Sequence, residues 1–368
     1  MRKTLQAYLL AALTSVGSYL PMSVLAQPTI DLLAKPAVMS ERAQRSVLLA
    51  ITRAGNRLVA AGERGFILLS DDNGASWQQA KVPVSVTLTG IHFPLPNKGW
   101  AVGHGGVILH SSDGGKTWTK QLDGKRAAEL ELAAAKRVAE ADPDSREAQW
   151  RLKSAQRLVA SGPDKPFLDL HFFDDQRGLV VGAYGLMFAT DDGGRNWRSA
   201  QDQLENPRGM HLYNLSAEGS QVVIAGEQGE LHYSDDGGRH FTKLQVPYKG
   251  TFFGAVTSAQ GDLVVFGLRG NAFHSPDGRT HWSKLDLGLP VTLTHGIRID
   301  DGSLILVDEM GRVLQSHDGG RSFKALPLQN PSSFTAVTQT SDGALMLSGV
   351  RGLTQLALKS NLSESQHE

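Results

Sequence analysis

Short runs of apolar residues repeat along the chain, and polar turns separate them. The first two sets of runs lie at 46–52, 57–61, 66–69 and 77–82, and at 90–93, 99–102, 107–110 and 117–122. Runs of this length that are rich in Val, Ile, Leu and aromatic residues and are bounded by Gly and Asp predict β-strands. Each set of four therefore predicts one small antiparallel sheet.

A recurring turn follows the third run of each unit. It reads Ser/Thr-x-Asp-x-Gly-x-Thr/Ser-Trp/Phe and is called the box below. Its aspartates are Asp72, Asp113, Asp192, Asp236, Asp277 and Asp318. Successive aspartates are 41, 79, 44, 41 and 41 residues apart, and the long step is one unit plus an insertion of 38. A period near 41 residues predicts the blades of a β-propeller, in which each sheet needs its neighbours to bury its faces.

A second turn, Gly-x-x-Gly, precedes every box and is called the GxxG turn below. Its glycine pairs are 62/65, 103/106, 182/185, 226/229, 267/270 and 349/352, and Asp308 replaces the first glycine before Gly311. Seven such turns and six boxes predict seven blades, the last with only three strands of its own. Because an open sheet edge is an aggregation risk, we expect the N-terminal piece near 36–39 to supply the missing outer strand of blade 7.

The extra residues between the second and third blades predict a helical hairpin. Residues 125–141 are rich in Ala, Leu, Glu and Lys, which are strong helix formers. Asp144 is expected to cap the second helix, with Glu147 completing a capping box. Trp150 lies off the apolar stripe of that helix, so we expect it to dock onto the propeller or onto a partner. The alternative is that Trp150 covers the end of the hairpin itself.

These patterns predict an all-β fold class, a seven-bladed β-propeller of four-stranded antiparallel blades with an α-helical hairpin inserted between blades 2 and 3. The predicted boundaries are 1–26 for a signal peptide, 27–123 for blades 1 and 2 with the closing strand, 124–163 for the hairpin, 164–358 for blades 3 to 7, and 359–368 for a disordered tail.

The beginning of the chain has its own pattern. Arg2 and Lys3 precede a mostly apolar run from Tyr8 to Leu25, and small residues end it at Ala26. This pattern predicts a secretory signal peptide that is cleaved near Ala26, and hence a periplasmic or secreted protein. The alternative is a retained membrane anchor, because the apolar run is near the length of a spanning helix.

Composition removes several function classes. The chain has 37 basic and 37 acidic residues, so its charge gives no support for nucleic-acid binding. It has no cysteine, which excludes disulfides and thiolate metal sites. It has no P-loop or dinucleotide fingerprint, its histidines form no His-Glu metal motif, and a single box aspartate offers too few oxygens for calcium. We therefore predict a monomer with no cofactor and no metal.

The box resembles the Asp-box, or BNR, repeat of sialidases, xyloglucanases, sortilins and the photosystem II stability and assembly factors. The GxxG turn, the period near 41 and the seven units resemble the last family best, over roughly residues 36–358 without the insertion. The resemblance implies a non-enzymatic protein outside the cytoplasm that helps a membrane protein complex to assemble. The expected partner is therefore a membrane or envelope protein. The chain lacks the lipid-anchoring cysteine of cyanobacterial members and the transit sequence of plant members.

Strand order places the GxxG turns and the hairpin on one face of the ring and the boxes on the other. Arg64, Arg269 and Arg351 occupy the same position in the GxxG turns of blades 1, 5 and 7. The resemblance implies that arginines on one face receive a partner, and a guanidinium binds carboxylates bidentately. Together with Tyr184 and Trp150 they form the predicted partner-binding set. The alternative is that these are ordinary solvated turn arginines.

Carboxylates on the same face leave two further readings open. Glu63, Glu227 and Glu309 precede the arginine position in their turns and could pair with the arginines. A secreted glycoside hydrolase of sialidase type could use an arginine cluster with Tyr184 and Glu63 or Glu227, or a lone acid at Asp169 or Glu227. Sialidases typically have six blades, and xyloglucanases pair two propellers across a cleft. We therefore predict no catalytic residue and a binding protein.

Overall fold

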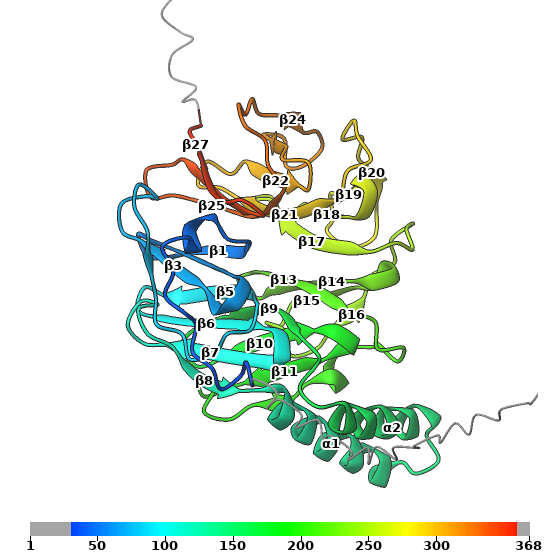
Figure 1. Cartoon of the computed structure of the whole chain (residues 1–368). Helices are drawn as coiled ribbons and strands as arrows, with labels where there is room; N and C mark the ends of the chain where they lie inside the picture. The colour runs from blue at the N-terminus through cyan, green and yellow to red at the C-terminus, as the bar shows by residue number, and fades with distance from the viewer. Residues whose placement is uncertain (1–30, 359–368) are drawn as a thin grey trace, which may run out of the picture. The chain divides into compact units, whose positions relative to one another are not determined.

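Each predicted unit folds into one antiparallel sheet (Figure 1). Blade 1 contains β1 (Leu48–Ala54), β2 (Arg57–Gly62), β3 (Ile67–Ser70) and β4 (Gln78–Gln79). Blade 2 contains β5 (Leu88–Leu95), β6 (Lys98–Gly103), β7 (Val107–Ser111) and β8 (Thr119–Leu122). Blade 3 contains β9 (Phe167–Phe172), β10 (Gly178–Gly182), β11 (Met187–Thr190) and β12 (Arg198–Ser199). Blade 4 contains β13 (Leu212–Glu218), β14 (Gln221–Gly226), β15 (Leu231–Ser234) and β16 (Thr242–Lys243).

The remaining blades follow the same order. Blade 5 contains β17 (Phe252–Thr257), β18 (Leu263–Gly267), β19 (Ala272–Ser275) and β20 (Ser283–Lys284). Blade 6 contains β21 (Leu293–Arg298), β22 (Leu304–Asp308), β23 (Val313–Ser316) and β24 (Lys324–Ala325). Blade 7 contains β25 (Phe334–Gln339), β26 (Leu345–Gly349) and β27 (Gly352–Leu356). The hairpin consists of α1 (Gly124–Ala141) and α2 (Arg146–Ser161), and a short 3-10 helix, η1 (Ala43–Arg45), precedes β1.

The computed structural model describes residues 31–358, and its first strands close a ring. The strands β1, β5, β9, β13, β17, β21 and β25 lie side by side in that order, and β25 lies beside β1. The propeller and its hairpin belong to one compact unit that begins at Leu32. The seven-bladed propeller with a helical insertion is thereby confirmed. The predicted signal peptide and the predicted tail lie outside the described residues.

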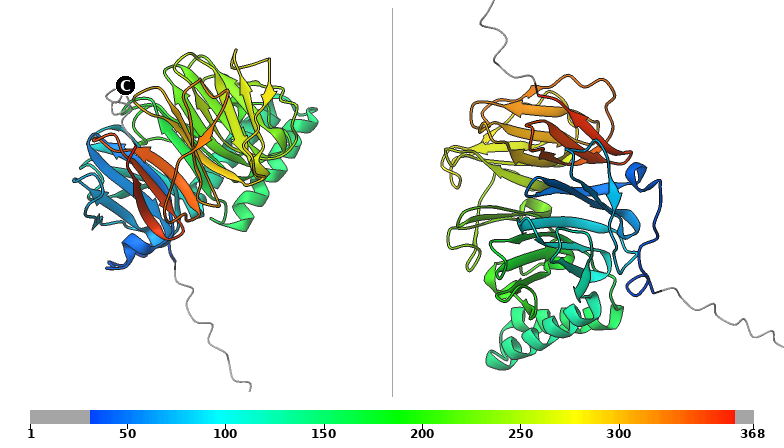
Figure 2. Two further views of the ribbon diagram at one scale, coloured as in Figure 1. Left: turned by 90° about the horizontal axis from the view of Figure 1, so that it is seen from above. Right: turned by 90° about the vertical axis from the view of Figure 1, so that its left-hand side faces the viewer.

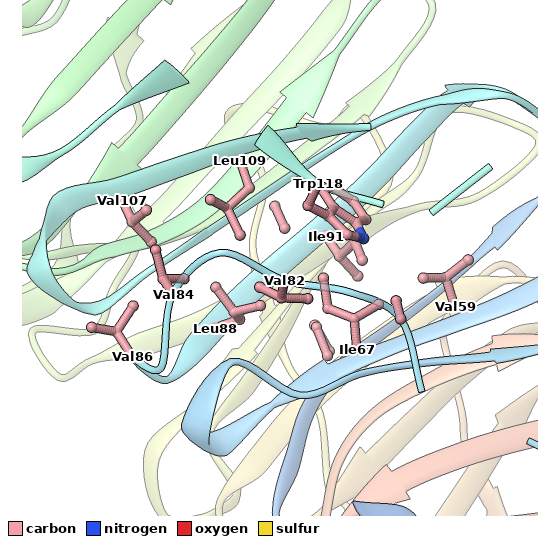
Figure 3. Packing of buried hydrophobic residues seen from close by; sticks show 14 of the residues in the cluster. Val59, Ile67, Val82, Val84, Val86, Leu88, Ile91, Val107, Leu109 and Trp118 are labelled. Carbon is pink, nitrogen blue, oxygen red and sulfur yellow. The ribbon is translucent and has the colours of Figure 1, made fainter. Parts of the chain in front are cut away.

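The core of the propeller lies between the blades. Every residue of β10, β18 and β22 is buried, because neighbouring sheets cover both faces of these strands. The apolar core divides into seven clusters, each shared by two adjacent blades. In one of them Val59 and Ile67 of blade 1 meet Ile91 and Leu109 of blade 2 (Figure 3). Burial of apolar surface thus joins each blade to the next.

The seam between blades 7 and 1 corrects one prediction. Blade 7 has three strands among the described residues, and the segment 36–39 does not pair with it. Instead, the Ala37 amide donates to the Val82 carbonyl at 3.0 Å, on the link that leaves blade 1. The seam is closed by side chains, because Met346 packs in the blade 1 core cluster. The Thr335 hydroxyl also donates to the Leu48 carbonyl at 2.6 Å. Among residues 31–358, no further strand pairs with the outer edge of blade 7.

The capping residues of the two hairpin helices differ slightly from those expected from the sequence. The Asp123 carboxylate accepts from the Arg126 amide at the start of α1, at 3.3 Å. Ser145, rather than Asp144, caps α2 by accepting from the Ala148 amide at 3.2 Å. The cap moves by one residue because the serine hydroxyl can reach the third amide of a helix that begins at Arg146.

Each box carboxylate is occupied within its own turn. In blade 2, Asp113 Oδ1 accepts from the Ser111 hydroxyl at 2.8 Å and from the Thr117 amide at 2.9 Å. Its Oδ2 accepts from the Thr117 hydroxyl at 2.6 Å. The Trp118 indole donates to the Gly115 carbonyl at 2.8 Å. The other five boxes repeat the bonds of the carboxylate, so the aspartate ties the turn together instead of presenting free oxygens to a cation.

These bonds predict a stability change in acid. Hydrogen bonds from Ser76 and Ser70 lower the pKa of Asp72 to about 2, from an ordinary value of 3.8. A lowered pKa stabilises the fold above the unfolded-state pKa, and this contribution is lost as the pH falls through the folded-state pKa. We expect the Tm to fall between about pH 4 and pH 2. Calorimetry of Asp72→Asn should show a lower Tm at neutral pH and a shallower fall in that window; an unchanged slope would contradict the assignment.

The seam between blades 7 and 1 yields a second prediction. Met346→Ala should leave a cavity between these blades, where the methionine is 1% exposed. We expect a loss of about 2–5 kcal/mol in the free energy of unfolding, measured by urea denaturation. Met39→Ala is the matched control, because Met39 is exposed and should change stability little. Equal effects of the two substitutions would show that the seam does not depend on this packing.

Candidate partner-binding face

The hairpin and the GxxG turns lie on the same face. The first residue of α1 lies against the GxxG turn of blade 2, since a Cβ added at Gly124 would be 2.7 Å from the Gly105 carbonyl oxygen. The two helices run side by side along one edge of the ring (Figure 2). The boxes stand at the other end of the third strands, so the predicted division of the two faces agrees with this geometry.

Five GxxG turns share an uncommon backbone conformation. Their second inner residue is left-handed, with φ of 55° at Arg64, 59° at Tyr184, 53° at Gln228 and 55° at Arg269, while Gly105 takes 69° without strain. This conformation is unfavourable for residues with a Cβ, and such strain is concentrated at functional sites. Four non-glycine side chains therefore keep a costly conformation on one face of the ring.

Arg351 does not share the conformation of Arg64 and Arg269. Gly349 and Gly352 pair directly as the ends of a two-residue turn, and only Gly352 has positive φ, at 94°. The equal spacing in the sequence suggested an equivalent position for all three arginines. The structure makes Arg64 and Arg269 equivalent and places Arg351 in a different turn.

The turn glutamates bind backbone amides rather than arginines. Glu63 accepts from the Val47 amide at 3.2 Å, Glu227 from the His211 amide at 3.3 Å and Glu309 from the Thr292 amide at 3.1 Å. Each carboxylate thus fixes the link that enters its own blade. Within residues 31–358 no carboxylate forms an ion pair with Arg64, Arg269 or Arg351, and all three are exposed.

A groove separates α2 from blades 3 and 4. It has a volume of about 800 Å³ and is bounded by α2, the GxxG turn of blade 3 and the link 201–209. Trp150, 44% exposed, and Tyr184, 57% exposed, both line it. A Cβ added at Gly209 would be 3.5 Å from Cη2 of Trp150, so this tryptophan faces the propeller rather than the end of the hairpin. The structure therefore brings two of the predicted residues together.

One end of the groove carries basic and aromatic side chains, and its lysine, Lys165, pairs with Asp164 at 2.5 Å. Lys165 Nζ lies 4.9 Å from the centre of the Tyr184 ring, and that ring lies 4.9 Å from the His211 ring. Arg208 lines the groove beside them and donates to the Gln228 amide oxygen at 2.6 Å. Sequence reasoning missed Lys165 and Arg208. The signal was present in the 44-residue step between the boxes of blades 3 and 4, because the lengthened link carries Arg208.

The other end of the groove contains a buried ion pair that attaches the hairpin. Arg151 donates to Glu131 at 2.8 and 3.1 Å, and the Ser199 hydroxyl of β12 donates to the same carboxylate. Burial alone would lower the pKa of Arg151, but Glu131 and the charges of Asp202 and Glu147 raise it overall. The pair joins both helices to blade 3 and so fixes the position of α2, which carries Trp150.

The candidate residues for catalysis are held by other groups. Asp169 lies on the first strand of blade 3 and accepts from Leu170 N at 2.8 Å, Leu215 N at 2.9 Å and Asn214 Nδ2 at 2.8 Å. Burial raises its pKa to about 6 despite these bonds. It joins blade 3 to blade 4 near the axis, whereas Glu227 binds its own link on the GxxG face. The two acids therefore do not form an acid–base pair.

His92 and His171 hold the same position in the first strands of blades 2 and 3, and their rings pack against each other. The rings of His92 and His171 lie 4.4 Å apart, and burial lowers the pKa of His171 to about 4. The Nδ1 atom of His92 accepts from the Phe172 amide at 3.2 Å. In the part of the chain that the structure describes, no three His, Asp or Glu side chains are grouped to hold a metal ion.

Comparison with known proteins gives similarities to photosystem II assembly factors. A sequence model of the family described as photosynthesis system II assembly factor YCF48 matches residues 69–138 and 150–251, and the gap falls at the turn between α1 and α2. The photosystem II assembly lipoprotein Ycf48 of Synechococcus sp. (strain CC9902) is 35% identical over 82 residues, which are 22% of this chain and 25% of that protein. The chloroplastic photosystem II stability/assembly factor HCF136 of Cyanidioschyzon merolae (strain NIES-3377 / 10D) is 25% identical over 240 residues, 59% of this chain and 50% of that protein. The matches thus span a quarter and a half of these relatives.

Solved structures share the fold over most of their length. YCF48 bound to a D1 peptide has a TM-score of 0.61 at 16% identity, over 86% of this chain and 95% of that chain. YCF48 from Cyanidioschyzon merolae has a TM-score of 0.60 at 14% identity, over 88% and 98%. The GH74 xyloglucanase from Xanthomonas campestris has a TM-score of 0.56 at 12% identity, over 85% and 52%. At such identities these likenesses show the propeller fold alone.

The fold and its two recurring turns define a seven-bladed propeller of the BNR-repeat class. Within that class the chain resembles the photosystem II assembly factors, and it is similar in sequence to Ycf48 and HCF136. The resemblance read from the boxes, the GxxG turns and the period is thereby confirmed.

The buried ion pair predicts how the groove can be disrupted. Glu131→Gln leaves Arg151 buried without a full counter-charge and should cost about 3–5 kcal/mol of local stability. We expect faster protease cleavage of the hairpin and a changed Trp150 environment. Glu129→Gln is the matched control, because Glu129 pairs with Arg126 at 2.8 Å on the exposed side of the same helix and should matter little. Equal protease resistance of both variants would contradict the attachment.

Proposed function

We propose that this protein is a non-enzymatic binding factor that holds a segment of a membrane or envelope protein on its GxxG face. The observation that carries the proposal is the convergence of Trp150 and Tyr184 on one groove with Lys165 and Arg208 beside them. Large aromatic side chains in such sites contribute most of the binding energy at protein interfaces. The proposal is also supported by relatives named as assembly factors and by a YCF48 structure that contains a D1 peptide.

The groove indicates the chemistry of the bound segment. An apolar or aromatic side chain fits against Trp150 and Tyr184, and an acidic group fits at the end that holds Lys165 and Arg208. The opposite end is lined by Asp142, Glu147 and Asp202 and suits a basic group. The exposed arginines Arg64, Arg269 and Arg351 lie on other blades, so we propose them as parts of the wider face rather than of the groove.

A non-catalytic role agrees with the hydrogen bonds that the candidate carboxylates already accept. The acids considered for glycoside hydrolysis accept backbone hydrogen bonds, and hydrolysis of this kind needs two carboxyl groups that flank a scissile bond.

We further propose that the protein acts outside the cytoplasm. The predicted signal peptide supports this location. Among the described helices, none is both long and apolar enough to cross a membrane.

The proposal predicts weaker binding of partner proteins when the two aromatic side chains of the groove are replaced by alanine. Detergent-solubilised envelope proteins would be passed over immobilised wild type and over a Trp150→Ala, Tyr184→Ala variant. We expect the variant to retain the fold but to lose about tenfold or more in affinity for specifically captured proteins, since aromatic anchors contribute at least about 2 kcal/mol. Leu95→Ala, at the turn between β5 and β6, is the control and should capture normally. Identical capture by the double variant would remove the groove from the mechanism.

A further inference from the structure

The outer edge of blade 7 differs from the outer edges of blades 1 to 6. In those six blades the chain places one apolar residue against the third strand at the end of the fourth, and this residue is called the seat residue below. In five blades its amide donates to a third-strand carbonyl at 2.8 to 2.9 Å, and in blade 2 it pairs with Ile108. The seat residues are Ala80, Leu122, Ala200, Leu244, Leu285 and Leu326. Among residues 31–358, blade 7 has no such residue.

The seat residue also packs against the box aromatic of the next blade. Leu122 of blade 2 shares a core cluster with Trp197 of blade 3, and Leu285 of blade 5 shares one with Phe323 of blade 6. At the seam between blades 7 and 1 the box aromatic is Trp77. A pocket of about 610 Å³ lies beside it, and Met346, Leu353 and Gln355 of blade 7 also line that pocket. The pocket therefore occupies the place that a seat residue fills elsewhere.

Strand register identifies the backbone groups that face this place. Leu353 pairs with Ser348, the residue before the turn glycine, and Ile67 holds this position in blade 1. The Ile67 carbonyl accepts from the seat residue of blade 1 at 2.8 Å. Because antiparallel pairing alternates along a strand, Leu353 and Gln355 direct their amide and carbonyl groups away from β26. No strand among residues 31–358 pairs with that side of β27, so its groups are open to an added strand.

Two basic side chains lie at the GxxG end of the pocket. Arg351 belongs to the turn that precedes β27, and Arg45 belongs to the link that enters blade 1. A Cβ added at Gly352 would be 3.1 Å from the Cα of Arg45, so this link lies beside the turn. Both arginines line the pocket, whereas no acid does. Glu41 is not among the lining residues, and Glu63 already accepts from a backbone amide of the link at 3.2 Å. This end therefore favours a carboxylate.

The sequence after β27 does not offer a seat residue of its own. Ala80 follows Ile67 by 13 residues, and blades 3 to 6 keep this interval, but the same interval from Leu353 leads to Gln366. The single apolar residue in 359–368 is Leu362. Opposite Leu353 it would require a two-residue turn at 357–358, where neither residue has the positive φ of such turns. The position therefore suits a segment from another protein.

We propose that blade 7 binds an extended segment of a partner protein as its fourth strand. The segment runs antiparallel to β27 and donates a backbone amide to the Leu353 carbonyl, and its apolar side chain packs beside Trp77. Fourth strands run from the box face to the GxxG face, so an acidic residue that follows the apolar one reaches Arg45 and Arg351. In such strand addition, main-chain hydrogen bonds give affinity and side-chain pockets give specificity. The site lies outside the groove of α2 and goes beyond the proposed function.

A fourth strand of the protein itself provides the probe. The labelled peptide Thr-His-Trp-Ser-Lys-Leu-Asp-Leu copies residues 280–287 of blade 5 and has Asp286 directly after the seat residue Leu285. It would be titrated with the full chain and followed by fluorescence anisotropy. We expect saturable binding, about fivefold weaker binding of the peptide with Asp286→Asn, and no binding of the peptide with Leu285→Asp. Hydrogen exchange of the amides in 353–356 should slow when the peptide is bound.

Proline at the edge tests the added strand. Gln355→Pro removes an outward amide and keeps the bonds to β26, because proline is tolerated at sheet edges. It should weaken peptide binding by about tenfold or more. Ala325→Pro is the matched control, since Ala325 is an exposed residue on the outer strand of blade 6 and should leave binding unchanged. The Tm of each variant would confirm its fold.

A second pair of variants tests the charges. Arg45→Ala with Arg351→Ala should remove the preference for the acidic peptide over its Asp286→Asn version. Arg195→Ala with Arg239→Ala, in the boxes of blades 3 and 4, should preserve that preference.

Three results would overturn the proposal. They are the absence of saturable binding to the wild type, equal binding to Gln355→Pro, and unchanged hydrogen exchange in 353–356 on addition of the peptide. If a terminal segment of the chain or a second copy already covers the edge, exchange there will be slow without the peptide and the peptide will not bind, which also contradicts it. Failure here leaves the groove test on solubilised proteins unaffected, because that groove lies on blades 3 and 4.

Discussion

The blades of this propeller can bury their faces only against one another, and this constraint shapes the rest of the molecule. Strands such as β10, β18 and β22 are buried along their whole length. A sheet of four short strands has two apolar faces and no core of its own, so a lone blade would leave both in water. The ring satisfies every face at once. Variation is consequently confined to turns and links, where the hairpin and the lengthened link 201–209 occur.

The candidate groove is built from two such variable segments, the hairpin and the link 201–209. The hairpin adds no strand to the ring, and a buried Glu131–Arg151 pair with the Ser199 hydroxyl attaches it to blade 3. Removing one member of a buried pair is costly, whereas apolar contacts tolerate sliding. The pair therefore fixes one orientation of α2 and with it the position of Trp150. Left-handed residues in the GxxG turns add a second fixed element, because the turn holds Tyr184 outward at a cost that the surrounding blade sustains.

Sequence reasoning recovered what repetition encodes. The boxes and GxxG turns gave the blade count, the two faces and the class, because each copy satisfies the same local hydrogen bonds. It also placed Trp150 and Tyr184 on the same face. It missed Lys165 and Arg208, since no repeat marks a residue in a link. It equated Arg351 with Arg64 and Arg269, although the turn of blade 7 has another geometry. It assigned 36–39 to blade 7, whereas Ala37 bonds to Val82, because an unpaired edge does not specify its own partner.

Blade 7 has three strands in the part of the chain that the structure describes, and this bears on how the chain reaches its folded state. Every described blade is built from one contiguous stretch of sequence, so each sheet can form in order as the polypeptide emerges. Only the last step joins distant parts, such as Thr335 to Leu48, which are 287 residues apart. No strand is exchanged across that junction. A newly synthesised chain can therefore form an open crescent with six finished seams, and closing it requires only that two preformed sheets meet.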